Sequence, residues 1–242
     1  MRISVIVPAY NEEKTIASVL EALLREVADV YEIIVVDDGS KDQTAPIAEA
    51  VSRQEPRVRV IRQPVNQGKT AALRTGFAAS TGDIVLIQDA DLEYDPVDIR
   101  GLVEPIQLGK ADVVYGSRFM TRRASRVLYF RHFIANQGLT FLSNLFTDLN
   151  LSDVETGYKA FRGEIIRNMI IETKGFGFEI EVTAKVAKLK CRVYEVPISY
   201  YGRTYEEGKK IGFRDGLDAV YYIFKYNWFV SLKQSYSRVP KL

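Results

Sequence analysis

Short runs of β-branched and aliphatic residues, separated by longer amphipathic segments, constrain the fold of this 242-residue chain more than any other feature. Runs such as IIVV and IVLI are apolar at every position, which is typical of strands that are covered on both faces. Alternation of such strands with helices indicates an α/β fold with a mostly parallel sheet flanked by helices. The predicted strands are Ile3–Val7, Glu32–Val36, Val58–Ile61, Ile84–Gln88, Asp112–Tyr115 and Arg192–Ile198. The predicted helices are Glu12–Glu26, Gln43–Arg53, Lys69–Ala79, Asp95–Leu108 and Phe213–Trp228.

The pattern changes after residue 118. The stretch Arg122–Phe146 is basic at its start and aromatic and aliphatic afterwards, and no acidic residue lies between Asp112 and Asp148. No linker divides the chain, so we predict one domain over residues 1–230, with halves at 1–118 and 119–230. Residues 231–242 are expected to form a frayed tail. One stripe of the last helix carries Leu217, Val220, Tyr221, Phe224 and Trp228.

Composition excludes several classes of protein. Cys191 is the only cysteine, so an intrachain disulfide and a two-cysteine metal site are excluded, which fits the cytoplasm. A net charge of +2 does not argue for nucleic acid. No stretch approaches the ~20 apolar residues of a spanning helix, and Ile3–Ala9 is a strand and not a signal peptide. Any work at a membrane is therefore expected at its surface, or through the anchor of a partner protein.

Three polar clusters follow predicted strands, at the positions where ligands bind in open parallel sheets. Pro8–Glu12 follows the first strand, Asp37–Ser40 the second, and Asp89–Glu93 the fourth. Extended residues at i and i+2 point the same way, so Asp89, Asp91 and Glu93 are expected to converge. Oxygen ligands at this spacing suit Mg²⁺ or Mn²⁺, which also bind phosphates. In the second cluster, Asp38 suits a hydrogen-bond acceptor for a base or ribose. For Asp37 or Asp38 taken alone, a helix N-cap is about as good an interpretation.

The motifs PAYNE, VDDGS, DAD and GSR, in this order and spacing, resemble the family 2 glycosyltransferases of the GT-A fold. The resemblance runs from Ile3 to about Tyr226. The later segments DVETGYKAFR, GFGFEIEVTAKV and ISYYGRTYEEGKK are similar to the polyprenyl-phosphate branch, typified by dolichyl-phosphate mannose synthase. The resemblance implies a nucleotide-sugar half at 1–118 and a C-terminal acceptor-side helical extension in 119–230.

The same resemblance implies roles for individual residues. Pro8, Tyr10, Glu12, Val36 and Asp38 would line the nucleotide pocket. Asp89, Ala90 and Asp91 would meet the diphosphate and the metal, with Glu93 completing the coordination. Arg118, Arg203 and Lys209 would supply cations around the phosphates and, with Asp91, the catalytic set. Arg118 and Arg131 would bind the acceptor phosphate. For Arg203 and Lys209, an ordinary solvated loop is the alternative.

We therefore expect an inverting, metal-dependent transfer of a hexose from a nucleotide-sugar, foremost mannose from GDP-mannose, to polyprenyl or dolichyl phosphate. The expected place is the cytoplasmic face of a membrane, and no nucleic acid is expected to bind. The alternatives are UDP-glucose or another UDP-sugar as donor, and a saccharide hydroxyl as acceptor, for which Glu179 or Asp153 would be the base. A nucleotidyltransferase or a binding module is the alternative from another class. The segment NQGKT around Lys69 is not a P-loop, because a P-loop needs a second glycine five residues before Gly68 and this chain has Gln63 there.

Overall fold

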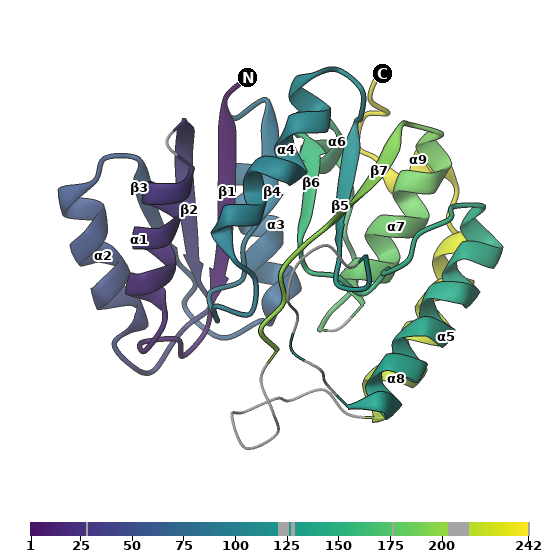
Figure 1. Cartoon of the computed structure of the whole chain (residues 1–242), viewed down its shortest axis with the longest axis horizontal. Coiled ribbons are helices and arrows are strands. Elements are labelled where there is room, and N and C mark those ends of the chain that lie inside the picture. The colour runs from purple at the N-terminus through teal and green to yellow at the C-terminus, as the bar shows by residue number, and fades with distance from the viewer. Residues whose placement is uncertain (28, 121–125, 127–128, 176, 203–212, 242) are drawn as a thin grey trace.

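A computed structural model describes residues 1–27, 29–120, 126, 129–175, 177–202 and 213–241, with side chains described outside 213–215. In this part of the chain, seven strands form one sheet in the order β3-β2-β1-β4-β6-β5-β7, which Figure 1 shows from left to right. Every predicted strand is present, and the α/β class is confirmed. The strands are β1 (Ile3–Ala9), β2 (Val30–Asp37), β3 (Val58–Arg62), β4 (Ile84–Ile87), β5 (Val113–Ser117), β6 (Lys159–Arg162) and β7 (Val193–Pro197).

Strand β6 is the element that positions the functional edge of the sheet. It runs antiparallel to β4 and β5, whereas the other strand pairs are parallel. Its sequence, KAFR, begins and ends with a cation, so the apolar pattern did not predict it. Because β6 is reversed, it begins at the edge where its neighbours end. The segment 153–158 therefore reaches the same edge as the loops after β1, β2, β4 and β5.

Helices cover both faces of the sheet because strand residues alternate between two apolar clusters. Ile33 of β2 packs into the cluster under α1 (Ile16–Glu26) and α4 (Ile99–Gln107). Ile34 packs into the other, under α3 (Lys69–Ala79), α6 (Gly163–Asn168) and α7 (Phe178–Leu189). Helix α2 (Thr44–Gln54) packs on α1 and β3, and the 3-10 turn η1 (Pro96–Asp98) leads into α4. Both faces are covered, as the apolar strands predict.

Helix α5 (Phe130–Thr147) packs against α7 and α8 (Phe213–Phe224) through a small cluster around Val154, Ile180 and Ile223. Figure 1 shows α5 and α8 side by side at the lower right. A π-helix, η2 (Lys225–Phe229), continues α8 and completes the predicted last helix. The face of this helix that is buried differs from the predicted stripe. Ala219, Ile223 and Tyr226 are buried, whereas Leu217, Tyr221 and Trp228 are exposed.

The C-terminal segment is ordered, so the predicted frayed tail is wrong. Ser231 and Gln234 form a capping box that starts helix α9 (Leu232–Ser235). Tyr236 bridges to Met169, is buried, and donates a hydrogen bond to the carbonyl oxygen of Lys185 at 2.9 Å. The polar letters of this segment gave no periodic signal, and its order comes from contacts with α6 and α7.

Candidate functional site

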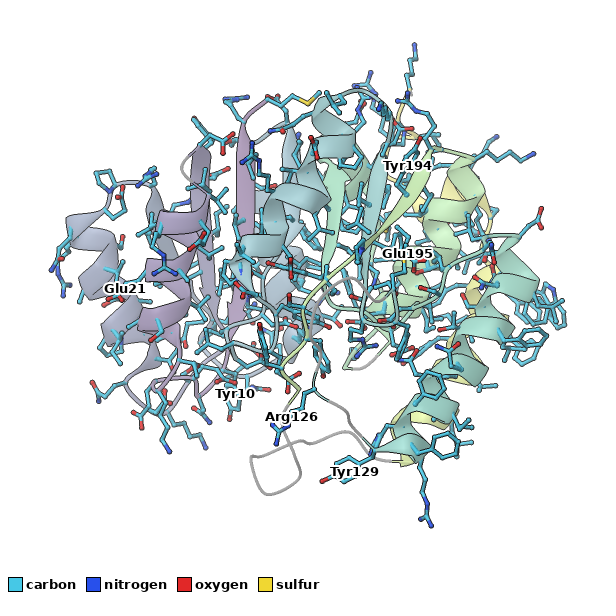
Figure 2. The ribbon with its side chains drawn as sticks, viewed as in Figure 1. Tyr10, Glu21, Arg126, Tyr129, Tyr194 and Glu195 are labelled. Carbon is cyan, nitrogen blue, oxygen red and sulfur yellow. The ribbon has the colours of Figure 1, made fainter. Side chains whose placement is uncertain are left out.

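A pocket of about 510 Å³ opens where the loops after β1, β2, β4 and β5 meet the segment before β6. In Figure 2, Tyr10 and Arg126 lie along this edge of the molecule. The lining contains most of the predicted site residues: Pro8, Tyr10, Glu12, Asp38, Asp89, Ala90, Asp91, Glu93 and Arg118. The rest of the lining is Ala9, Asn66, Gly68, Lys69, Ala72, Tyr94, Glu155, Gly157, Gly175, Phe178, Glu179 and Tyr200.

Val36 is not part of this lining. Its side chain is fully buried in the core on the face of β2 that meets α3. A Cβ built on Gly76 of α3 would lie 3.4 Å from a methyl group of Val36. The prediction that Val36 lines the pocket is therefore wrong for its side chain, since the strand alternation turns that side chain towards α3.

The loops after β1 and β2 hold each other in place at one end of the pocket. The backbone N–H of Asn11 donates to Oγ of Ser40 at 3.0 Å, and the N–H of Lys41 donates to Oδ1 of Asn11 at 2.9 Å. The N–H of Glu12 donates to Oγ1 of Thr44 at 2.7 Å. These bonds fix the backbone around Tyr10 and Glu12, so this end of the pocket is formed before any ligand binds.

Asp38 fixes a third loop to the same end. Its two carboxylate oxygens accept hydrogen bonds from the backbone N–H groups of Gln67 and Gly68, at 2.9 and 2.7 Å. Burial raises the pKa of Asp38 above its usual range, against these two bonds. The neighbouring Gly39 has a φ of 71°, and a Cβ there would lie 2.8 Å from the backbone nitrogen of Asn66. Asp38 therefore lines the pocket as predicted and also shapes it.

Lys69, at the start of α3, pairs with Asp89. Its Nζ lies 2.7 Å from one carboxylate oxygen of Asp89 and 2.9 Å from the other. Burial opposes the charge of Lys69, but the carboxylates of Asp89 and Glu179 raise its pKa above the usual range. Gly157 makes room for the pair, because a Cβ at Gly157 would lie 2.8 Å from Oδ2 of Asp89. Sequence reasoning placed Lys69 at a helix start and missed this role.

The other two predicted metal ligands also contact protein donors. The backbone N–H of Glu93 donates to Oδ1 of Asp91 at 3.1 Å, and the hydroxyl of Tyr200 donates to Oε2 of Glu93 at 2.9 Å. Leu92 between them has a φ of 61°, which costs a non-glycine residue ~1–2 kcal/mol. In the described part of the chain, no three His, Cys, Asp or Glu side chains form a group that could hold a metal ion. The predicted cluster of three carboxylates is therefore not preformed.

Arg118, directly after β5, enters the pocket from a fixed position. The Nε, Nη2 and backbone N–H of Arg118 donate hydrogen bonds to the carboxylate of Asp153, at 2.6, 2.7 and 3.1 Å. The guanidinium also lies 5.2 Å from the ring centroid of Tyr200. The side chain of Asp153 is fully buried. Because both of its oxygens are occupied by Arg118, Asp153 orients that arginine, and its alternative role as a base is not supported.

Sequence reasoning did not select Glu155, although it lines the pocket beside the predicted residues. Its Oε1 is buried and has no hydrogen-bond partner. Burial and repulsion from Glu179 raise the pKa of Glu155 to about 7. Lys159 is fully buried nearby, and burial lowers its pKa to about 8. The motif DVET gave no sign of this, because the antiparallel β6 brings Glu155 to the pocket.

Some predicted cations cannot be placed in the pocket. Arg203 and Lys209 lie outside the described residues, as do Arg122 and Arg123. The segment before Arg203 does reach the pocket, since the N–H of Tyr201 donates to the carbonyl oxygen of Glu93. Arg131 is exposed on the first turn of α5 and is not in the pocket lining. Its role with an acceptor phosphate stays a prediction.

Comparison with known proteins agrees with this arrangement. The family model "Glycosyl transferase family 2" matches residues 4–170. The chain is 31% identical to the undecaprenyl-phosphate mannosyltransferase of Micrococcus luteus over 88% of each protein. It is 30% identical to the dolichol-phosphate mannosyltransferase of Pyrococcus furiosus, over 88% of this chain and 60% of that longer protein.

Among solved structures, glucosyl-3-phosphoglycerate synthase from Mycobacterium tuberculosis, in complex with Mn²⁺, uridine diphosphate and glucosyl-3-phosphoglycerate, superposes with a TM-score of 0.72. The sequence identity is 25%, over 93% of this chain and 80% of that one. The expected GT-A arrangement is confirmed by this likeness.

Proposed function

The chain belongs to glycosyl transferase family 2, and on that premise we propose that it transfers a hexose, foremost mannose, from a nucleotide-sugar to a polyprenyl phosphate. The observation that carries the proposal is the pocket at the carboxyl edge of the sheet, where rigid loops, acidic groups and the paired cations Lys69 and Arg118 converge. The names of the mannosyltransferases that the chain resembles support the lipid-phosphate acceptor and the sugar. GDP as the carrier of the mannose is the donor we expect.

The donor lies along the pocket in this proposal. The nucleoside contacts Pro8, Tyr10, Glu12 and Asp38 at the interlocked loops, and the diphosphate reaches the Asp89–Asp91 segment. Lys69 and Arg118 are the described cations closest to that segment in the lining, and Arg203 and Lys209 are proposed to add to them. Fixed cations in a buried site stabilise the charge that develops on a departing nucleoside diphosphate.

A divalent ion fits this site in one particular way. Mg²⁺ and Mn²⁺ are usually held by one or two carboxylates together with phosphate oxygens and water, so a preformed three-carboxylate cluster is not required. Asp91 would hold the ion. Asp89 and Glu93 would also bind it if Asp89 gave up its contact with Lys69 and Glu93 its hydrogen bond from Tyr200. The bound ion would supply neutralising charge for the diphosphate. The Mn²⁺ complex of the structural neighbour supports a divalent ion in this proposal.

The reaction needs no protein base with a phosphate acceptor. The phosphate of the lipid is already anionic at neutral pH, and its oxygen attacks the anomeric carbon. The bond from that carbon to the diphosphate breaks, the bond to the lipid phosphate forms, and the nucleoside diphosphate leaves with the bonding electrons. An in-line attack inverts the configuration and gives a β-linked product from an α-linked donor. Asp153, held by Arg118, is consistent with chemistry that uses no base.

The lipid side of the proposal rests on an exposed apolar surface, which we call the aromatic stripe. It comprises Phe130, Ile134, Phe141 and Leu145 of α5, with Trp228 and Phe229 of η2. Phe130, Phe141 and Phe229 are at least 70% exposed. Contiguous exposed apolar patches of this kind mark interaction sites for proteins or membranes. None of the described helices is long and apolar enough to cross a membrane. We propose that the stripe lies in the acyl boundary of a membrane that holds the acceptor.

The decisive experiment identifies a product. Purified protein is incubated with Mg²⁺ or Mn²⁺, a short polyprenyl phosphate, and either GDP-mannose or UDP-glucose, and the products are analysed by mass. We expect a hexosyl-phosphoprenol, with loss of ~100-fold or more in rate for Asp91→Asn. The matched control is Glu104→Gln on the exposed face of α4, which keeps the wild-type rate. Transfer only to saccharide hydroxyls, or full activity of Asp91→Asn, contradicts the proposal.

Membrane contact is tested separately by flotation with vesicles. Phe141→Ser combined with Leu145→Ser is expected to reduce binding to phosphatidylglycerol vesicles at least ~10-fold, because each buried side chain contributes ~1.5–3 kcal/mol. Leu108→Ser, an equally exposed leucine after α4, is the control and leaves binding unchanged. Equal binding of the double variant and the wild type would remove the aromatic stripe from the proposal.

A further inference from the structure

The order of the strands gives the pocket a direction. The loops that would hold the nucleoside follow β1 and β2, and the diphosphate segment follows β4. On the other side of β4 come β6 and β5, with Glu155 before β6 and Arg118 after β5. A nucleotide-sugar is linear in the order nucleoside, diphosphate and sugar. When its nucleoside lies at β1 and β2 and its diphosphate at β4, its sugar lies at β6.

Glu155 is a side chain in this region with a buried atom whose bonding is incomplete. It lines the pocket, and its Oε1 is buried without a hydrogen-bond partner. Buried polar atoms in native proteins nearly always have a partner, so an orphaned one in a binding pocket needs an explanation. A ligand that donates a hydrogen bond to Oε1 provides it.

The backbone around Glu155 is held firmly, so the orphaned oxygen is not a consequence of a loose loop. The ammonium of Lys159 donates to the carbonyl oxygens of Val154 and Thr156, on either side of Glu155. The N–H of Val154 donates to Oγ1 of Thr140 in α5 at 3.2 Å. Val154, Thr156 and Lys159 are all fully buried. Several hydrogen bonds thus fix the backbone on either side of Glu155, while its Oε1 has no partner.

We propose that Glu155, together with Glu179 on the first turn of α7, binds hydroxyl groups of the transferred hexose and determines which hexose is accepted. The assignment rests on the proposed glycosyl transfer and names the sugar-reading residues of that same pocket. Both side chains line the pocket, and they come from different elements, so each would bind a different hydroxyl group of the sugar ring.

The chemistry of the two carboxyl groups selects a sugar over the other parts of the ligands. A phosphate would be repelled by a pair of carboxylates, whereas the hydroxyls of a hexose are uncharged donors. A divalent ion is not favoured, since no three acidic side chains in the described part of the chain form a metal-binding group. A general base is not needed when the acceptor substrate is a phosphate. Hydroxyl recognition is the role that remains for a partly buried carboxyl group here.

The test measures binding, so it does not depend on finding the right acceptor. Calorimetry gives the affinities of GDP, GDP-mannose and monodeoxy analogues of GDP-mannose for the wild type, Glu155→Ala, Glu179→Gln and the control Glu104→Gln. We expect Glu155→Ala to weaken GDP-mannose by about 10- to 100-fold and GDP by less than about 2-fold. One monodeoxy analogue, which lacks the hydroxyl that Glu155 binds, is expected to bind wild type and Glu155→Ala equally well. Glu179→Gln is expected to act on a different hydroxyl.

Glu155→Gln separates recognition from structure. Because the neutral amide removes the repulsion from Glu179, we expect its melting temperature to equal or exceed that of the wild type. A clear fall in melting temperature, or equal weakening of GDP and GDP-mannose, overturns the proposal in favour of a structural role. Unchanged GDP-mannose affinity with lost turnover overturns it in favour of proton transfer. If wild type binds neither GDP-mannose nor UDP-glucose better than the free nucleotide, the proposed donor class itself fails.

Discussion

Replacement of Asp153 by alanine tests how the pocket fixes its buried arginine. The change removes the acceptor of three hydrogen bonds from Arg118, at 2.6, 2.7 and 3.1 Å. Asp153 is fully buried and Arg118 is 16% exposed, so water cannot replace the lost partner well. Removing one member of a buried ion pair costs ~3–5 kcal/mol. For a chain of this length each kcal/mol lowers the melting temperature by ~2–4 °C, which predicts a fall of about 6–20 °C.

Urea denaturation of a double-variant cycle measures the interaction itself. Asp153→Ala, Arg118→Met and the combination are compared with the wild type, at a pH where the carboxylate is charged. We expect the double variant to be more stable than the sum of the two single losses implies, by at least ~2 kcal/mol, because it leaves no buried charge alone.

Two results would refute this reasoning. The first is a stability loss of less than ~1 kcal/mol in Asp153→Ala, which would mean that the pair is solvated. The second comes from Asp153→Asn. If this variant keeps its melting temperature and its nucleotide affinity but loses turnover, Asp153 acts as a base, and its assignment as the residue that orients Arg118 is wrong.

Three further variants test the surroundings of the site. Arg192 holds the pKa of Asp112 at about 2, below the ordinary ~3.9, so this stabilisation is complete above pH ~4 and disappears as pH falls through about 2. Acid titration of the unfolding free energy should show Asp112→Asn losing up to ~2.6 kcal/mol at neutral pH and matching wild type near pH 2. Parallel titration curves for the two proteins would contradict this. Gly157→Ala brings a methyl group against Asp89 and should weaken nucleotide binding ~10-fold by calorimetry with an unchanged fold by circular dichroism; wild-type affinity would count against it. Tyr236→Ala should lower the free energy of unfolding, measured in urea, by ~3–5 kcal/mol, because this side chain is buried. A change below ~1 kcal/mol would indicate that the C-terminal segment is frayed after all.

The sequence predicted the sheet because local signals define it. Runs such as IIVV at β2 are apolar on both faces, and the polar clusters after β1, β2 and β4 are fixed in place by the strands that precede them. These clusters supplied nine of the 21 residues that line the pocket. Strand β6 and Glu155 were missed because their positions depend on an antiparallel pairing between residues far apart in the chain. Likewise, the pairing of Lys69 with Asp89 joins the start of α3 to the loop after β4, and neither segment indicates the pair by its own sequence.

The faces of the last helices were harder to predict than the helices themselves. The stripe through Tyr221 and Trp228 was recognised as apolar, and amphipathic patterns usually mark the buried side. In this chain the buried side carries Ala219, Ile223 and Tyr226, whereas Tyr221 and Trp228 of the stripe are exposed. Aliphatic and aromatic residues lie on both of these faces of the helix, so the pattern alone did not identify the face that packs on the protein.

A crystal structure with Mn²⁺ and the intact nucleotide-sugar would show whether this pocket binds the donor as proposed. We expect the nucleoside against Tyr10, anomalous density for Mn²⁺ between Asp91 and the diphosphate, and the hexose within hydrogen-bond distance of Glu155. The opposite result is a nucleotide bound outside this pocket while Lys69 still holds Asp89 as it does here.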